Sequence, residues 1–225
     1  MPAGSPWLPP DFAGFPTLAA GLRLHRIYHR DYEPLAANPS SRVRFALPGT
    51  HAMFYAGATR SIALWETVLR DVPGGAAEVF LSAKALKGRS CVEIELVHDV
   101  PHLALAQAPM RSMIPFEGAV WHEIAALCRA DTYEGTHAAA RELEAELRAA
   151  GHALPLLSWP SRQDGGGLAY LGYEPPMSDA DWRVVGTPID LDDPDEGHAM
   201  IREELGRCGL RWVPLATTAT RPRSR

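Results

Sequence analysis

Cysteine is scarce in this chain of 225 residues, which carries only Cys91, Cys128 and Cys208. The three are odd in number and lie far apart in the sequence, so they predict free thiols rather than a disulfide framework. Free thiols persist in a reducing compartment, most simply a cytoplasm. We therefore expect a cytoplasmic protein whose core is held together by apolar packing.

Long apolar runs are also lacking. No stretch approaches the roughly 18 residues that a bilayer-spanning helix requires, and the N-terminus does not show the basic and then continuously apolar pattern of a secretory signal. Basic residues are in deficit, since 22 Lys and Arg stand against 27 Asp and Glu, giving a net charge of -5. These absences disfavour contact with a membrane and direct binding of nucleic acid.

Motifs of the common metal and nucleotide sites are missing as well. The segment 122–128 begins like the helix of a zinc protease, but position 126 is alanine where the second histidine would stand. The nine histidines show no strong ligand spacing and no CxxC pair occurs, so we expect no metal. The glycines 165–167 lack the continuation of a P-loop or of a dinucleotide-binding turn, and on their own are typical of a flexible hairpin loop.

The chain does have the composition of an ordinary globular protein, with 46% hydrophobic and 22% charged residues. Residues 91–97 alternate between apolar and acidic side chains, as in a half-buried strand. Strands and helices alternate without a regular βαβ order, which predicts an α+β fold of mainly antiparallel sheet with flanking helices. Further strands are expected at 23–28, 52–56, 78–82 and 168–173, and helices at 59–70, 117–129, 137–150 and 195–207.

The two ends of the chain differ in composition from its middle. Five prolines in residues 1–20 predict an irregular N-terminal arm, because proline removes backbone donors and blocks helix formation. Residues 216–225 are polar and basic, which predicts a flexible tail. We therefore expect one globular domain over residues 21–215.

A glutamate on an apolar helix face is the first candidate for chemistry. In the expected helix 59–70, Glu66 follows Ile62 by four residues and precedes Leu69 by three, so it points near the apolar face. A carboxylate there costs free energy unless it is paired or used, and a structural ion pair is the simpler interpretation. Tyr55 ends the preceding strand, where it either opens onto the same cleft or belongs to the core.

Arginines on extended segments are the second group of candidates. Arg26 and Tyr28 are two residues apart and share one strand face, and Arg42 and Arg44 are expected to do the same. A guanidinium on a buried face needs an anion, either a structural carboxylate or a bound phosphate. The arginines are therefore compatible with a phosphate site and with an ion-pair network.

Taken in order, these segments resemble the RES domain family, which is named for its arginine, glutamate and serine residues. The similarity covers about residues 24–175. It departs from the family at residues 46–48, which replace a polar turn, and at an insertion around 72–88. The matching pieces are LHRIY (24–28), RVRF (42–45), MFYAGATRSIALWETV (53–68), TYEGTHAAARELEAEL (132–147) and LSWPSRQDGGGLAYL (157–171).

The resemblance implies six site residues and a fold related to the ADP-ribosyltransferase toxins. Its implied activity is that of a toxin that degrades NAD+ by phosphorolysis or hydrolysis, with inorganic phosphate as a co-substrate in the first case and no bound cofactor. The first alternative is an enzyme that ADP-ribosylates a specific protein. The second alternative is a non-catalytic module that binds NAD. The implied partner is a small Xre-like antitoxin. By position, the catalytic residues are Arg26, Glu66 and Ser161, and the substrate-binding residues are Tyr28, Arg44 and Tyr55.

The chemistry of these residue types agrees with cleavage of the nicotinamide–ribose bond. A carboxylate such as Glu66 stabilises the oxocarbenium-like sugar that forms as nicotinamide leaves. Arg26 and Arg44 would neutralise the pyrophosphate, and Tyr55 or Tyr28 would stack on nicotinamide. Ser161 would hydrogen-bond the ribose or a phosphate and hold Glu66 in place, since no motif supplies the base that a serine nucleophile requires.

Overall fold

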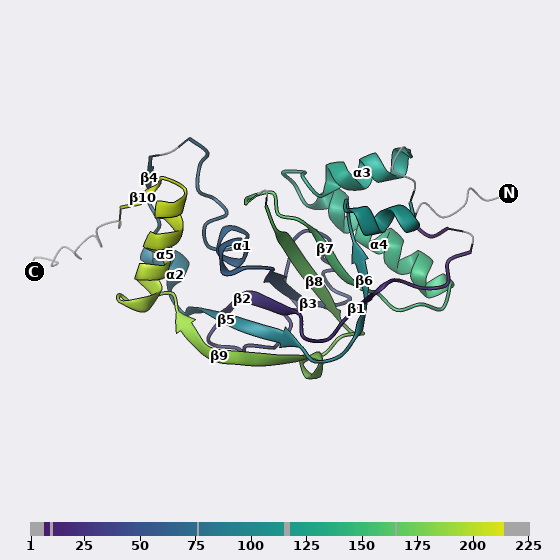
Figure 1. The fold of residues 1–225 in the computed structure, drawn as a ribbon, viewed down its shortest axis with the longest axis horizontal. Helices are drawn as coiled ribbons and strands as arrows, with labels where there is room; N and C mark the ends of the chain where they lie inside the picture. The colour runs from purple at the N-terminus through teal and green to yellow at the C-terminus, as the bar shows by residue number, and fades with distance from the viewer. Residues whose placement is uncertain (1–6, 10, 76, 115–117, 165, 214–225) are drawn as a thin grey trace, which may run out of the picture.

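An eight-stranded sheet forms the centre of the computed structural model, which describes residues 7–9, 11–75, 77–114, 118–164 and 166–213. Neighbouring strands are antiparallel except β6 and β7, which run parallel. The order across the sheet is β1-β6-β7-β8-β3-β2-β5-β9, and β10 and β4 form a separate pair (Figure 1). The strands are β1 Thr17–Leu18, β2 Arg23–His29, β3 Ala52–Gly57, β4 Glu78–Val79, β5 Arg89–Leu96, β6 Val100–Ala104, β7 Leu156–Pro160, β8 Leu168–Glu174, β9 Trp182–Asp190 and β10 Arg211–Trp212.

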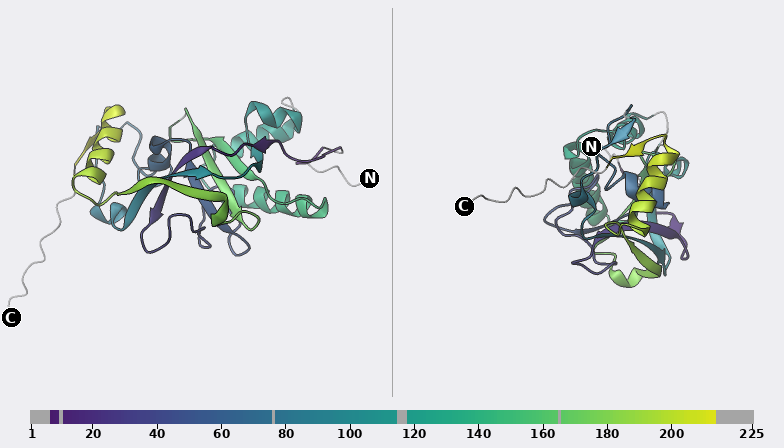
Figure 2. Two further views of the ribbon diagram at one scale, coloured as in Figure 1. Left: turned by 60° about the horizontal axis from the view of Figure 1, so that its bottom comes forward. Right: turned by 90° about the vertical axis from the view of Figure 1, so that its left-hand side faces the viewer.

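The helices gather at two ends of this sheet. Helices α3 and α4 cover one end, α2 and α5 lie at the other with β4 and β10, and α1 sits between them (Figure 1). The left view in Figure 2 shows the same separation of α5 from α3 and α4 along the long dimension of the molecule. The α-helices are α1 Arg60–Trp65, α2 Ala83–Leu86, α3 Ala119–Leu127, α4 Glu134–Ala149 and α5 Glu196–Arg207.

The expected α+β class with a mainly antiparallel sheet is confirmed. The alternation of apolar and acidic side chains along β5 matches its two faces, because Val92, Ile94 and Leu96 on the apolar face are almost fully buried. Glu95 on the opposite face is also covered, since it pairs with Arg23 at 3.2 Å and Arg183 at 2.5 Å. Cross-strand ion pairs thus allow an acidic residue on a shielded sheet face.

Helix α1 is shorter than its sequence predicts. Thr59 caps its start by accepting a hydrogen bond from the Ile62 amide at 3.2 Å, as expected of an N-cap threonine. The prediction that the helix continues to residue 70 is wrong, because it ends at Trp65. Thr67 donates its hydroxyl to the Ala63 carbonyl at 2.5 Å, a side-chain bond that competes with the helical pattern. Glu66 therefore stands at the C-cap instead of on a helix face.

Five strands were not anticipated from the sequence: β1, β6, β7, β9 and β10. Strands β1 and β10 have two residues each, and β6 and β7 have five each. Strand β9 contains Gly186 and Pro188, residues that weaken a strand pattern but are tolerated at a sheet edge. The glycine run connects β7 and β8 as a hairpin, closed by the Ser161 amide donating to the Gly167 carbonyl at 2.7 Å.

The two halves of the sheet separate between β2 and β3. Their ladder contains a single residue pair, His25 and Gly57, whereas β2 pairs with β5 over its whole length. Beyond that pair the two strands part, and Asn38 in the connection between them bridges back to Met53. The sheet is thus forked, and the fork leaves room for a cavity between strands that are neighbours in order.

The division of the chain into an N-terminal arm, a domain over residues 21–215 and a C-terminal tail remains a prediction. Trp7 in the arm is buried, and β1 pairs with β6, so the described part of residues 1–20 lies against the body. The basic tail at 216–225 lies outside the described residues. No helix in the described ranges is both long and apolar enough to cross a membrane.

We expect Tyr173→Phe to destabilise the fold. The buried Tyr173 hydroxyl donates to the carbonyl of Phe45 at 2.7 Å, and Phe45 holds a left-handed backbone with φ of 59° beside Arg44. Removing the donor leaves a buried acceptor unpaired, which lowers the free energy of unfolding by about 1–3 kcal/mol. Urea denaturation measures this change, with the exposed Tyr32→Phe as control. Equal midpoints for the two variants would contradict this account.

Candidate active site

A cavity of about 630 Å³ occupies the fork of the sheet. The second half of β2, the β3 residues Met53 and Tyr55, and the turn that follows α1 line it. The connection from β2 to β3 closes its remaining wall with residues 32–41. Four of the six expected site residues line this one cavity: Arg26, Tyr28, Tyr55 and Glu66.

The Glu66 carboxylate is held by two hydroxyl groups. Tyr55 Oη donates to Glu66 Oε2 at 2.9 Å, and Ser161 Oγ donates to Glu66 Oε1 at 2.6 Å. Ser161 is 2% exposed, and the amides of Gln163 and Asp164 donate to its Oγ at 3.3 Å. Each carboxylate oxygen therefore has its own donor, and the two donors come from β3 and from the β7–β8 hairpin.

The Tyr55 hydroxyl is suited to donate a hydrogen bond to the Glu66 carboxylate. Burial raises the pKa of Tyr55 well above its ordinary value, and the nearby negative charge of Glu66 adds to the shift. The phenol therefore stays protonated at any physiological pH. Its ring lies against Trp159 with centroids 6.0 Å apart, which fixes the direction of the hydroxyl.

Arg26 is a buried cation whose guanidinium has hydrogen-bond partners for only some of its nitrogens. Its guanidinium carbon lies 4.0 Å from the centroid of the Phe54 ring, and its Nη2 donates to the Ala36 carbonyl at 2.5 Å. Its Nη1 is buried and has no hydrogen-bond partner among the described residues. Burial lowers the pKa of Arg26 to about 10. An unpaired donor on a desolvated cation at a cavity wall is the arrangement that an incoming anion completes.

Tyr28 lies two residues further along the same strand. Burial raises the pKa of Tyr28, and a hydrogen bond with the Ser90 side chain opposes that shift. Ser90 in turn donates to Asp190 at 2.5 Å. Tyr28 therefore lines the cavity with a ring that is anchored on β5 and β9.

Arg44 takes a different place from the one expected. Residues 44 and 45 form a turn, so the shared face of Arg42 and Arg44 on an extended segment is not observed. The Arg44 guanidinium donates to the carbonyls of Leu127 at 2.5 Å and Ala130 at 2.9 Å. These carbonyls lie at and just beyond the C-terminal end of α3, and that of Leu127 also accepts from the Ala130 amide at 3.3 Å.

Arg44 nevertheless faces Glu66 through a second cavity. This cavity of about 220 Å³ adjoins the first, and Glu66 lines both. Arg70 also lines both, and its Nη1 donates to the hydroxyl of Tyr133 at 3.2 Å. Arg70 follows Glu66 by four residues, a helical spacing that could have identified it from the sequence. Arg162 closes the far side of this cavity through an ion pair with Asp131.

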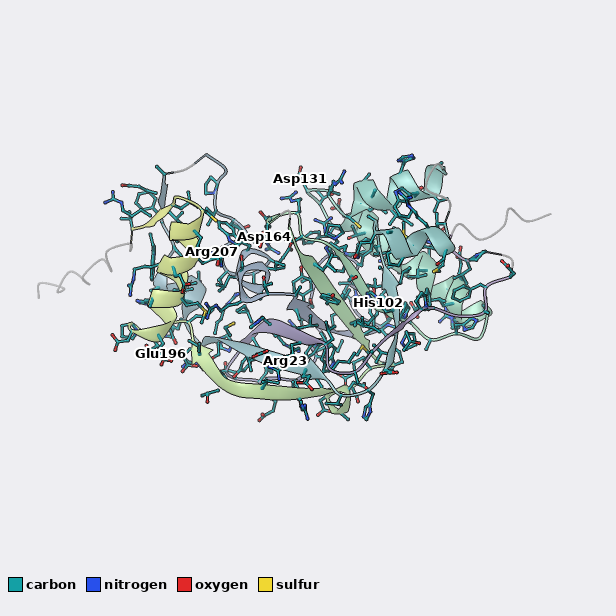
Figure 3. All side chains as sticks on the ribbon, viewed as in Figure 1. Arg23, His102, Asp131, Asp164, Glu196 and Arg207 are labelled. Atoms are coloured by element: carbon teal, nitrogen blue, oxygen red, sulfur yellow. The ribbon has the colours of Figure 1, made fainter. Side chains whose placement is uncertain are left out.

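A further cavity, of about 800 Å³, lies on the other face of α1. Its charged groups are already paired, since Arg207 lies 3.6 Å from Glu204 and Asp164 accepts from Ser61 at 3.0 Å. Figure 3 shows Asp164 and Arg207 at the gap between the β7–β8 hairpin and α5. None of the six expected site residues lines it, so the chemistry points to the forked cavity. Within the described ranges, no group of three or more His, Cys, Asp or Glu side chains is placed to hold a metal ion.

Comparison with known proteins bears on the family and the fold of this chain. A family model described as the RES domain matches residues 5–191. A chain of the crystal structure of the M. tuberculosis MbcT–MbcA toxin–antitoxin complex has a similar fold, with a TM-score of 0.53 and 13% sequence identity. The match covers 77% of this chain and 86% of that one. No curated protein matches the sequence.

We expect Arg26→Met to stabilise the unliganded protein. A cation whose pKa is lower in the folded state carries its full desolvation cost at every pH below the folded value of about 10, and so at pH 7. Removing it should raise the free energy of unfolding by about 1 kcal/mol. Inorganic pyrophosphate should raise the urea midpoint of the wild type by more than that of the variant, because the variant lacks the unpaired guanidinium donor of the larger cavity.

The exposed Arg202→Met is the matched control for this substitution, since it removes a solvated arginine from α5. A variant at Arg26 that is markedly less stable than the wild type, and that pyrophosphate stabilises to the same extent, would show that the guanidinium serves the fold.

Proposed function

The chain belongs to the RES domain family, and from that premise we propose that it is an NAD+-degrading toxin of a toxin–antitoxin pair, which cleaves the bond between nicotinamide and ribose. One observation carries the proposal. The Glu66 carboxylate, held by Tyr55 and Ser161, lines both cavities and shares the larger one with Arg26, whose buried Nη1 has no partner among the described residues.

Glu66 acts on the sugar. As nicotinamide leaves, the ribose gains positive charge, and a fixed carboxylate beside it stabilises that charge without reorganising. The hydrogen bonds from Tyr55 and Ser161 hold both carboxylate oxygens before substrate arrives. Ser161 is therefore assigned to position Glu66, since its own hydroxyl proton is directed at the carboxylate.

Arg26 and Tyr28 hold the substrate in the larger cavity. The unpaired Nη1 of Arg26 provides a charge-assisted donor for a pyrophosphate oxygen. The Tyr28 ring offers the substrate an aromatic face in the same cavity, while the Tyr55 hydroxyl serves Glu66. A volume of about 630 Å³ is within the range of small-molecule sites.

The smaller cavity favours a small acceptor. Its volume of about 220 Å³ and its arginines 44, 70 and 162 suit water or inorganic phosphate. With water the products are nicotinamide, ADP-ribose and a proton. With phosphate they are nicotinamide and ADP-ribose 1″-phosphate, because a phosphate oxygen takes the place of the nicotinamide nitrogen on the ribose carbon. Transfer to a protein side chain is the alternative outcome.

Purified protein incubated with NAD+ should release nicotinamide, and Glu66→Gln should reduce the rate by about 10²–10⁴-fold. Ser161→Ala should cost about 10²-fold through misplacement of the carboxylate. Chromatography of the products, with and without phosphate, identifies the acceptor. Glu203→Gln, an exposed glutamate on α5, is the control. The proposed activity would be refuted if folded wild-type protein left NAD+ intact in all three conditions: in water, in phosphate and with candidate target proteins.

Expression of the chain in bacteria should deplete cellular NAD+ and arrest growth, whereas the Glu66→Gln variant should do neither. The similar fold found in a toxin–antitoxin complex supports a protein partner, expected to be small and Xre-like. Co-expression of the protein encoded next to this chain should restore growth. Growth arrest by Glu66→Gln at equal expression would separate toxicity from NAD+ cleavage.

A further inference from the structure

The larger cavity extends from Glu66 to a rim that no assigned residue explains. This rim is formed by His29 at the end of β2, Tyr32 in the following turn and Arg89 at the start of β5. We propose that the rim binds the 5′-nucleotide half of the substrate, with Arg89 on its phosphate and Tyr32 on its base. The inference rests on the proposed function, because Glu66 at the other end fixes where the nicotinamide lies.

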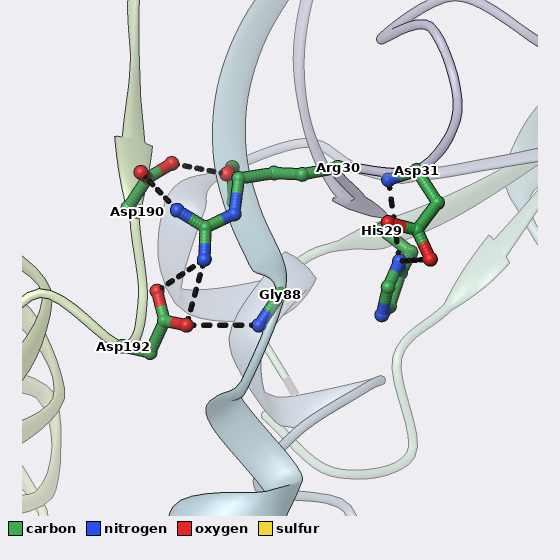
Figure 4. Close-up of polar contacts among 7 residues, drawn as sticks. His29, Arg30, Asp31, Gly88, Asp190 and Asp192 are labelled. Carbon is green, nitrogen blue, oxygen red and sulfur yellow. Dashed lines mark hydrogen bonds and ion pairs between the residues drawn. The ribbon is translucent and has the colours of Figure 1, made fainter.

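Arg89 is a cation that the fold does not use. It stands opposite His29 in the β2–β5 ladder, and its side chain makes no hydrogen bond or ion pair with another described residue. The neighbouring Arg30 shows the contrast, since it pairs with both Asp190 and Asp192 (Figure 4). Carboxylates are thus within reach of this corner, but they bind Arg30 and leave the guanidinium of Arg89 for a ligand anion.

The network around Arg30 makes the position of Arg89 rigid. The Gly88 amide donates to Asp192 at 2.9 Å (Figure 4). The Gly88 carbonyl accepts from the Arg30 amide at 2.7 Å. Gly88 has a φ of 69°, and a Cβ there would lie 2.8 Å from Nε2 of the His29 ring. Glycine is therefore required where the imidazole packs against the strand. The backbone that carries Arg89 is fixed on both sides before any ligand binds.

Tyr32 supplies an aromatic surface at the same rim. Its side chain is 69% exposed, an uncommon state for a tyrosine beside a cavity. Its ring meets the His29 ring edge to face, with centroids 6.4 Å apart. One face of the phenol thus stays open to solvent, and a purine stacked there would cover it.

The distance along β2 suits a nucleotide. Arg26 and His29 are three residues apart on β2, and a strand rises about 3.3 Å per residue, so their Cα atoms are separated by roughly 10 Å. An odd spacing directs the two side chains to opposite faces of an ideal strand, but His29 is the last residue of β2 and both residues line the same cavity. A ligand whose pyrophosphate meets Arg26 can therefore place its outer ribose and base at the rim. The smaller cavity has no room for the nucleotide half of the substrate, since its volume is only about 220 Å³.

Titration calorimetry with AMP tests the rim directly, because AMP has no nicotinamide bond to cleave. Wild-type protein and Glu66→Gln should bind AMP equally. Arg89→Ala and Tyr32→Ala should each raise the dissociation constant at least about tenfold, and Arg89→Lys, which keeps the charge but loses the planar fork, should fall between. The controls are Arg202→Ala and Phe80→Ala, an exposed arginine and an exposed aromatic residue on other surfaces.

Unchanged AMP binding in Arg89→Ala and Tyr32→Ala, or no saturable binding to the wild type, would overturn the assignment. The two proposals fail separately. AMP binding that depends on Arg89 in a protein that never cleaves NAD+ would refute the proposed activity and retain the rim. If Arg89→Ala cleaved NAD+ with an unaltered KM, the proposed activity would stand and the assignment of the rim would be refuted.

Discussion

The two hydrogen bonds to the Glu66 carboxylate are the interaction on which the site depends. They join three segments that are distant in the chain: β3 through Tyr55, the end of α1 through Glu66, and the β7–β8 hairpin through Ser161. The early end of α1 makes this possible, because a carboxylate at a helix C-cap is free to turn toward the sheet. The Thr67 hydroxyl that interrupts the helix thus belongs to the construction of the site.

The fork in the sheet is the second constraint, and it is not free of cost to the fold. Strands β2 and β3 give up most of a ladder that their lengths would allow, and the space between them holds a desolvated guanidinium with one unsatisfied nitrogen. Such features persist where the rest of the structure determines them strongly and function requires them. Here the full β2–β5 ladder and the three apolar clusters supply that support.

Much of this arrangement was accessible from the sequence, and the remainder was not for physical reasons. The proximity of Tyr55 and Glu66 follows from a strand, a short turn and a helix. Ser161 lies 95 residues from Glu66, so only the resemblance to the RES domain indicated it. The bonds of Arg44 to the end of α3 depend on packing between distant segments, which local patterns do not contain. Strand β9 was missed because edge strands tolerate glycine and proline.

The arginines in and around the forked cavity show how structural and ligand-binding cations are distinguished in such a protein. Arg30 is saturated by two aspartates and Arg44 donates to two carbonyl groups, so both stabilise the fold whatever else they bind. Arg26 keeps one buried nitrogen unpaired, and Arg89 has no side-chain partner among the described residues. In a chain with net charge -5, acidic residues outnumber the basic ones. Guanidinium groups left without carboxylates along one cavity therefore mark the positions where the anionic parts of a ligand are expected.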